Sequence, residues 1–285
     1  NVKPPSWRGD LKIKEDLVEE IARLYGLENI PSKELKFSDE DQEHKTSAFQ
    51  KIRNKIRKLL VSRGVFETIT WSFTDCSLET LIRGNENLLK IKNPISSDLS
   101  CLRSSLLPNL FNVIRKNNNK DIEDLAIFEI GPIFYGKEPG EQDDYLCVIK
   151  SGRVNKKNWL EKQRSFDFFD IKADLSATLK CFNVNIENCK FSRDTKSYYH
   201  PGKSGSLEFG GKEICFFGEI NPSIQNNLGL DNKIFTYELN ISELFKFYKI
   251  KSNSKKKLDA SSFQASKRDF SFEINEDIFS SEVIS

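Results

Sequence analysis

Residues 5–31 read PSWRGDLKIKEDLVEEIARLYGLENIP, and this stretch contains a helix with clear boundaries. Asp16 and Glu19 have the capping-box spacing, so we predict that the helix begins at Asp16. Apolar side chains then recur at helical spacing before a glycine that permits a left-handed stop, namely Leu17, Ile21, Leu24 and Tyr25 before Gly26. The pattern predicts a helix whose apolar stripe packs inward.

Four acidic residues lie in the same stretch: Asp10, Asp16, Glu19 and Glu20. The last three stand at positions i, i+3 and i+4, which makes their carboxylates neighbours on a helix. Converging carboxylates repel one another unless a cation lies among them, and hard oxygen ligands suit magnesium. Capping and the helix macrodipole also favour acids in a first turn, so the spacing leaves a metal site and a plain helix start both open.

The composition limits the classes of function. A chain of 285 residues is long enough for one large or two ordinary domains. Its 44 Lys and Arg residues nearly balance its 42 Asp and Glu residues, so any contact with RNA must come from local patches. No apolar run approaches the roughly 18 residues of a membrane span, and no signal peptide is visible. We therefore expect a cytoplasmic protein without membrane contact.

The six cysteines form no C-x-x-C pair, and the chain has only two histidines. A zinc site is therefore not expected. Without a secretory signal, we expect all six thiols to be reduced.

Polar segments at residues 32–45 and 250–259 predict two linkers. They divide the chain into domains at residues 1–33, 44–249 and 260–285. Since the first and last are short, we expect the chain to be a fragment of a longer protein.

The central region alternates between helix and strand patterns. Residues 46–64 predict a capped helix with an apolar face and a basic outer face, which is either solvated or meets RNA phosphates or an acidic partner. Further predicted elements are strands at 68–73, 125–130, 146–150 and 235–241, a helix at 168–182, a hairpin about Gly210-Gly211, a helix opening at Asn221-Pro222 and a strand over 270–274. This pattern indicates an α+β fold.

Several of these motifs together resemble the β subunit of bacterial phenylalanyl-tRNA synthetase. The matching runs, in chain order, are residues 5–31, NPIS at 93–96, LRSSLLP at 102–108, FEIG at 128–131, YHPG at 199–202 and KRD at 267–269. The resemblance implies the end of a small helical, winged-helix-like domain, then a class II synthetase-like antiparallel sheet flanked by helices. The start of a ferredoxin-like anticodon-binding domain follows.

The same resemblance implies a function. The family joins phenylalanine to tRNA(Phe) with ATP in an α2β2 enzyme, and catalysis belongs to the α subunit. This chain would supply interface and tRNA contacts, and Asp10, Asp16, Glu19 and Glu20 would bind Mg²⁺. The candidate tRNA contacts are Lys255, Lys256, Lys257, Lys267 and Arg268, although the three lysines fit a solvated tether equally well.

We expect the isolated chain to be inactive, with no catalytic residues. Arg103 stands near the place of the arginine that grips ATP phosphate in catalytic class II domains. The glycine-rich third motif of such domains has no counterpart here, and losing one phosphate clamp costs orders of magnitude in rate. Arg103 and Glu129 are therefore predicted to stabilise the fold.

The sequence also suggests three other classes of function. A hydrolase built on His200 and Ser204 is disfavoured, because the chain has no G-x-S-x-G elbow. A DNA-binding module is disfavoured by the nearly neutral charge and the missing recognition helix. A non-enzymatic RNA-binding or scaffold protein with the same domains stays open, since only its partner would distinguish it from a synthetase subunit.

Overall fold

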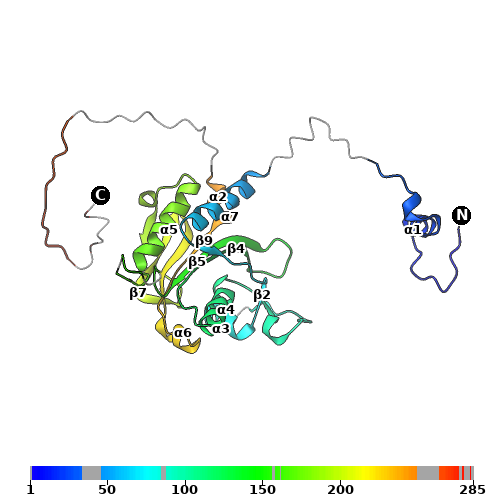
Figure 1. The fold of residues 1–285 in the computed structure, drawn as a ribbon, viewed down its shortest axis with the longest axis horizontal. Helices are drawn as coiled ribbons and strands as arrows, with labels where there is room; N and C mark the ends of the chain where they lie inside the picture. The colour runs from blue at the N-terminus through cyan, green and yellow to red at the C-terminus, as the bar shows by residue number, and fades with distance from the viewer. Residues whose placement is uncertain are drawn as a thin grey trace. The chain divides into compact units, whose positions relative to one another are not determined.

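The structure is a computed structural model that describes residues 2–33, 46–84, 88–155, 158–160, 162–248, 263–275, 278 and 283. The chain divides into two compact units, residues 1–246 and 247–285. A sheet with helices on both faces forms the main part of the first unit (Figure 1).

The sheet has seven strands in the order β1-β4-β5-β9-β8-β7-β6. In this order their bounds are Phe66–Glu67, Leu125–Phe134, Gln142–Ser151, Ile234–Asn240, Lys212–Ile220, Tyr199–Phe209 and Lys190–Ser192. All neighbours are antiparallel except β1 and β4, which pair in parallel. The α+β fold with a class II-like sheet is thus confirmed, with one parallel pair at its edge.

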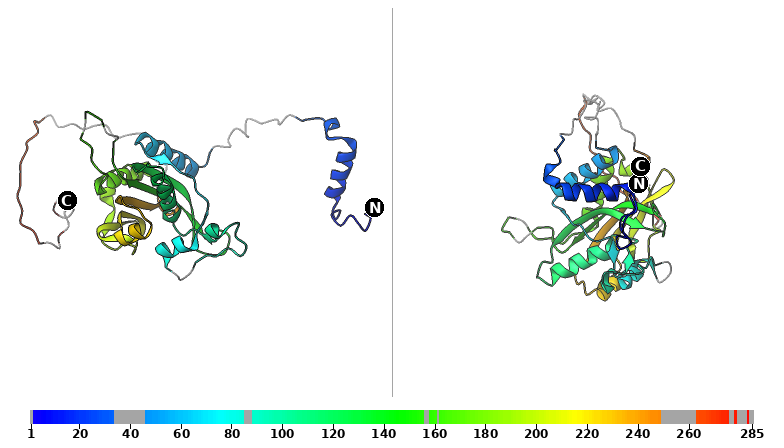
Figure 2. Two further views of the ribbon diagram at one scale, coloured as in Figure 1. Left: turned by 60° about the horizontal axis from the view of Figure 1, so that its bottom comes forward. Right: turned by 90° about the vertical axis from the view of Figure 1, so that its right-hand side faces the viewer.

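Helices cover both faces of the sheet (Figures 1 and 2). One face carries α2, Ala48–Ser62, α5, Phe168–Cys181, and the short α7, Ile241–Lys246. The other carries α3, Cys76–Arg83, α4, Leu107–Asn118, and α6, Pro222–Asn227. A two-stranded sheet of β2, Phe73–Thr74, and β3, Cys101–Leu102, lies beside α3 and α4. The core is the apolar layer on each side of the central strands, of which β9 is buried along its whole length.

Most predicted elements of the central region are present. Ser47 caps α2 by accepting a hydrogen bond from the Gln50 amide at 3.2 Å, and the inward face of α2 buries its isoleucines. The β7–β8 hairpin turns at Gly210 and Gly211, whose φ angles are 61° and 75°. Such left-handed angles strain any other residue, which is why the double glycine marked the turn correctly.

Three predictions for the chain beyond the first linker were wrong. The strand expected over residues 68–73 does not form: β1 ends at Glu67 and β2 begins at Phe73. Between these two strands, Ile69 and Trp71 are 89% and 68% exposed. The strand expected over 270–274 has no regular structure among the described residues, since an isolated strand has no partner for its backbone groups. The thiols were expected to be reduced, but Cys76 and Cys101 form a disulfide.

Within the described residues, no helix has the length and apolar character needed to cross a bilayer.

Candidate functional site

The predicted metal ligands lie around α1, Lys14–Tyr25, where an arginine holds two of them. Arg8 Nη2 lies 2.7 Å from Asp10 Oδ2 and 2.6 Å from Glu20 Oε1. Arg23 Nη2 contacts the other Glu20 oxygen at 2.7 Å. Arg8 lowers the pKa of Asp10 by hydrogen bonding, and Arg8 together with Arg23 lowers the pKa of Glu20 to about 2. Both carboxylates are therefore charged and already neutralised from within the chain.

Asp16 has a different partner. The helix begins at Lys14 rather than at Asp16, and Asp16 Oδ2 accepts hydrogen bonds from the backbone amides of Lys12 at 2.7 Å and Ile13 at 2.9 Å. These amide donors lower the pKa of Asp16. The Asp16 carboxylate thus binds residues 12–13 to the first turn of α1, and this stabilising role needs no ion.

The arrangement around α1 does not match a preformed magnesium site. In the part of the chain that the structure describes, no group of three or more His, Cys, Asp or Glu side chains is placed to hold a metal. Asp10 and Glu20 would have to release Arg8 before they could ligate an ion together with Asp16 and Glu19. The apolar stripe of α1 was also expected to pack inward, yet Ile21 and Leu24 are 67% and 78% exposed and no residue of α1 is buried.

The second candidate site surrounds Arg103, which was predicted to stand near the position of the ATP-binding arginine of catalytic class II domains. Arg103 follows β3 and is buried, with a side chain that is 2% exposed. Its Nη1 donates to Glu129 Oε1 at 2.7 Å and to Thr70 Oγ1 at 3.0 Å, and its Nε donates to the Pro132 carbonyl at 2.9 Å. Every described contact of this guanidinium is internal, which supports the structural role predicted for Arg103 and Glu129.

Gly131 makes this arrangement fit. A Cβ added at Gly131 would collide with Arg103 Nη2, so only glycine lets the guanidinium lie flat against β4. Arg103 therefore lies between β4 and the 68–72 segment and is bonded to both.

A buried polar cluster, which no sequence motif indicated, lies on the face of β9 that is covered by α4. Glu238 accepts hydrogen bonds from Ser105 Oγ at 2.5 Å and from the hydroxyls of Tyr198 at 2.8 Å and Tyr199 at 3.2 Å. Burial raises the pKa of Glu238 and raises the pKa of both tyrosines well above the ordinary value. These side chains satisfy one another's hydrogen-bonding groups, so they join β9 to the start of β7 and to the segment before α4.

The hydrolase alternative fails on geometry. His200 Nδ1 accepts a hydrogen bond from the Gly202 amide at 3.0 Å, and Ser204 Oγ donates to the His200 carbonyl at 2.5 Å. The serine and the imidazole therefore each bond to backbone, and they do not form the nucleophile and base pair that the reaction requires.

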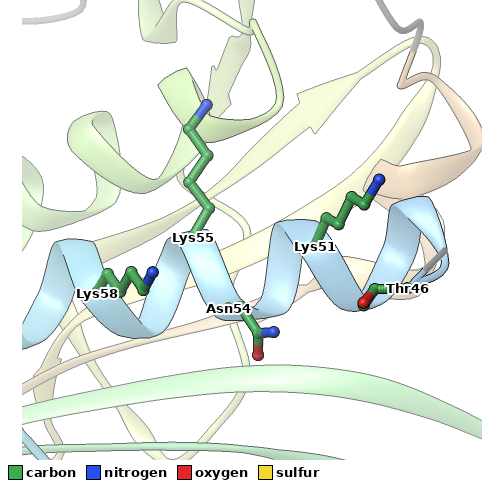
Figure 3. A pocket seen from close by; sticks show the side chains of 5 residues that line it. All are labelled: Thr46, Lys51, Asn54, Lys55 and Lys58. Carbon is green, nitrogen blue, oxygen red and sulfur yellow. The ribbon is translucent and has the colours of Figure 1, made fainter.

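The arginines and the lysines on the outer face of α2 have different surroundings. Arg53 binds Asp144 at 3.1 Å and Arg57 binds Glu67 at 2.6 Å, so the two arginines fasten α2 to neighbouring elements. Lysines instead line an open hollow of about 380 Å³, whose lining residues are Thr46, Lys51, Asn54, Lys55 and Lys58 (Figure 3). An open basic hollow of this kind is typical of a solvated helix face.

The predicted tRNA contacts are described only in part. Lys255, Lys256 and Lys257 lie outside the described residues. Lys267 and Arg268 lie in an exposed segment, residues 263–275, that has no helix or strand. Their role stays a prediction.

Comparison with known proteins defines the family. Residues 34–241 match the family model for the phenylalanyl tRNA synthetase beta chain CLM domain, and residues 1–27 match the tRNA synthetase B5 domain. The chain is 35% identical to a phenylalanine–tRNA ligase beta subunit from Paramagnetospirillum magneticum over 99% of its length, and 37% identical over 98% to one from a Wolbachia of Brugia malayi. It spans 35% and 34% of those two proteins, about a third of their length.

A similar fold occurs in a pyrrolysyl tRNA synthetase from Desulfitobacterium hafniense. The two share 14% sequence identity and a TM-score of 0.53, over 81% of this chain and 74% of that one. This likeness supports the class II fold alone. Since a single family model covers most of the chain in one continuous match, the chain belongs to the phenylalanyl-tRNA synthetase beta-chain family.

Proposed function

We propose that this chain is a non-catalytic part of a phenylalanine–tRNA ligase. It would serve in the cytoplasm as the class II-like scaffold of the β subunit in an α2β2 complex, while the α subunit carries out the ATP-dependent attachment of phenylalanine to tRNA(Phe). One observation carries the proposal: the Arg103 side chain is 2% exposed and bonds to Glu129, Thr70 and the Pro132 carbonyl, so this guanidinium is not presented to ATP. Membership in the family supplies the rest.

Residues 66–71, which comprise β1 and the segment after it, expose apolar side chains that a partner protein could cover. Phe66, Ile69 and Trp71 are 74%, 89% and 68% exposed, although large apolar side chains are usually buried. Their backbone is held by Thr68, whose amide donates to the Phe128 carbonyl at 2.7 Å, so the side chains project from a fixed support. We assign this segment to the interface with the α subunit.

Mixing this chain with a bacterial phenylalanyl-tRNA synthetase α subunit should give a stable complex near the mass of two plus two chains, measured by light scattering after gel filtration. Ile69→Glu should weaken the complex at least tenfold, because it places a charge in the interface. Trp159→Ala is the matched control, since Trp159 is 92% exposed on another loop. Two separate peaks would leave truncation or a scaffold role as the explanation, and the same experiment on the full-length gene product would separate the two. Pyrophosphate release from ATP and phenylalanine by the chain alone would contradict the missing active site.

Magnesium binding to Asp10, Asp16, Glu19 and Glu20 stays part of the proposal. Calorimetric titration should show weak binding, because an incoming ion must displace Arg8 from two carboxylates. Glu20→Ala should abolish that heat. Glu15→Ala removes an acid from the first turn of α1, where Glu15 Oε1 lies 3.5 Å from Lys14 Nζ, and should leave the heat unchanged. Identical titrations for the wild type and Glu20→Ala would remove the site.

The tRNA contact can be tested through its salt dependence. Replacing Lys267 and Arg268 by alanine in the mixed complex should reduce the slope of log affinity against log salt by about one to two, since each phosphate contact releases condensed counterions. Replacing Lys255, Lys256 and Lys257 by alanine as well should reduce this slope further. The measurement is filter binding of tRNA(Phe) from about 50 to 200 mM salt, and an unchanged slope would count against these contacts.

A further inference from the structure

The cysteines fall into two groups. Cys147, Cys181, Cys189 and Cys215 are buried single thiols, and burial raises the pKa of each, most strongly for Cys147 and Cys215. Thiols of this kind are inert, because the thiolate is the reactive form. Cys76 and Cys101 instead lie together and are joined by a disulfide.

The backbone brings Cys76 and Cys101 together through separate supports. Cys76 is the first residue of α3, whose cap Asp75 accepts a hydrogen bond from the Ser77 amide at 2.7 Å. Cys101 is held in β3 by its register with Thr74 of β2. Their Cα atoms are 5.3 Å apart, within the range of about 4.4–6.8 Å that a disulfide spans without backbone movement.

The two sulfurs differ in access. Cys101 is fully buried, whereas Cys76 is only half-buried at the start of its helix. Ser100 Oγ also donates a hydrogen bond to Cys76 Sγ at 3.3 Å, so a polar side chain lies beside that sulfur. An external thiol therefore reaches Cys76 and not Cys101.

We propose that Cys76 and Cys101 form a reversible thiol–disulfide site that exchanges with small dithiols. In reduction, a thiolate of the dithiol bonds to Cys76 Sγ, the bond between the cysteines breaks, and its electron pair leaves on Cys101 Sγ, which takes up a proton. The second thiol of the reagent then displaces Cys76, so two protein thiols and one cyclic disulfide result. Oxidation by the cyclic disulfide runs the same steps backwards.

The bond constrains the chain across a sequence separation of 25 residues, between α3 and β3. Opening it restores conformational freedom to the unfolded chain, and the oxidised form should therefore melt about 5–10 °C above the reduced form. The folded elements stay in place on reduction, because β3 keeps its pairing with β2 and the Leu102 amide still donates to the Leu89 carbonyl at 2.9 Å.

The test is a non-reducing peptide map of the chain equilibrated with reduced or oxidised dithiothreitol. In the oxidised sample, the tryptic peptide that ends at Arg83 should be joined to the one that ends at Arg103. After reduction, iodoacetamide under native conditions should label Cys76 at least tenfold faster than Cys147, Cys181, Cys189 or Cys215. Failure to recover the joined peptide, or equal labelling of these cysteines, would overturn the proposal.

Two variants separate the exchange from general stability. Cys76→Ala should eliminate the joined peptide and melt at the same temperature with and without reductant. Cys189→Ala also removes a thiol, yet it should retain both the joined peptide and the shift in melting temperature. If reductant lowers the melting temperature of Cys76→Ala as much as that of the wild type, the shift does not come from this bond and the proposal fails.

Discussion

Replacing Arg103 with alanine is expected to lower the free energy of unfolding by about 3–5 kcal/mol, because Glu129 would keep a buried charge without its partner. Both side chains are at most 3% exposed, so water cannot compensate. Chemical denaturation followed by circular dichroism measures the loss. In a domain of this size, the melting temperature should fall by about 10 °C.

The matched control for this change is Lys190→Ala. Lys190 pairs with Glu208 at 3.6 Å, but its side chain is 77% exposed, so the loss should stay within about 0.5 kcal/mol. If Arg103→Ala cost no more than Lys190→Ala, Arg103 would not be bound into the fold as described, and its assignment as a structural rather than an ATP-binding arginine would be wrong.

Asp174→Ala should also cost about 3–5 kcal/mol, since Asp174 joins three elements through two cations. From α5 its Oδ1 accepts a hydrogen bond from Arg63 Nε at 2.6 Å, just beyond α2, and its Oδ2 lies 2.7 Å from Lys150 Nζ on β5. Lys150 is 7% exposed, and without Asp174 its buried ammonium group would lose the carboxylate that neutralises it. The free energy of unfolding from urea titration measures the effect.

Glu208→Ala serves as the control for Asp174→Ala, because it removes a carboxylate from the exposed Lys190 pair. Asp174→Asn keeps the shape and removes only the charge, so it should lose less than Asp174→Ala while still exceeding Glu208→Ala. Equal losses in all three variants would show that Lys150 finds another partner.

The elements that local chemistry specifies were predictable from the sequence. The α2 helix has its serine cap and apolar face, the β7–β8 turn has its double glycine, and α5 has its apolar period. The 68–73 segment has a strand pattern, but Glu129 accepts hydrogen bonds from the Thr70 amide and hydroxyl, and side-chain capture of this kind replaces the ladder. The sequence pattern cannot show that long-range competition.

The candidate sites were predictable to a smaller degree. The acids around α1 and the arginine at position 103 were predictable as candidates from residue type and spacing. Their ion-pair partners, which indicate a structural role, are visible only in the structure. Arg8 was visible in the sequence, but its contact with Glu20 spans twelve residues. The pairing of Cys76 with Cys101 was not predictable, since spacing alone does not define connectivity, and the Glu238 cluster draws on β9, β7 and the 103–106 segment at once.

The short strands at the two edges of the sheet limit how other proteins can attach to this one. Edge strands can recruit a foreign strand when their backbone groups are free over a long stretch. Here β1 has two residues and β6 has three, and where β7 extends beyond β6 it contains Pro201, which has no amide hydrogen, and the charged Lys203. Strand addition is disfavoured at both edges, so a partner has to recognise side chains, and its specificity is set by shape and charge rather than by backbone pairing.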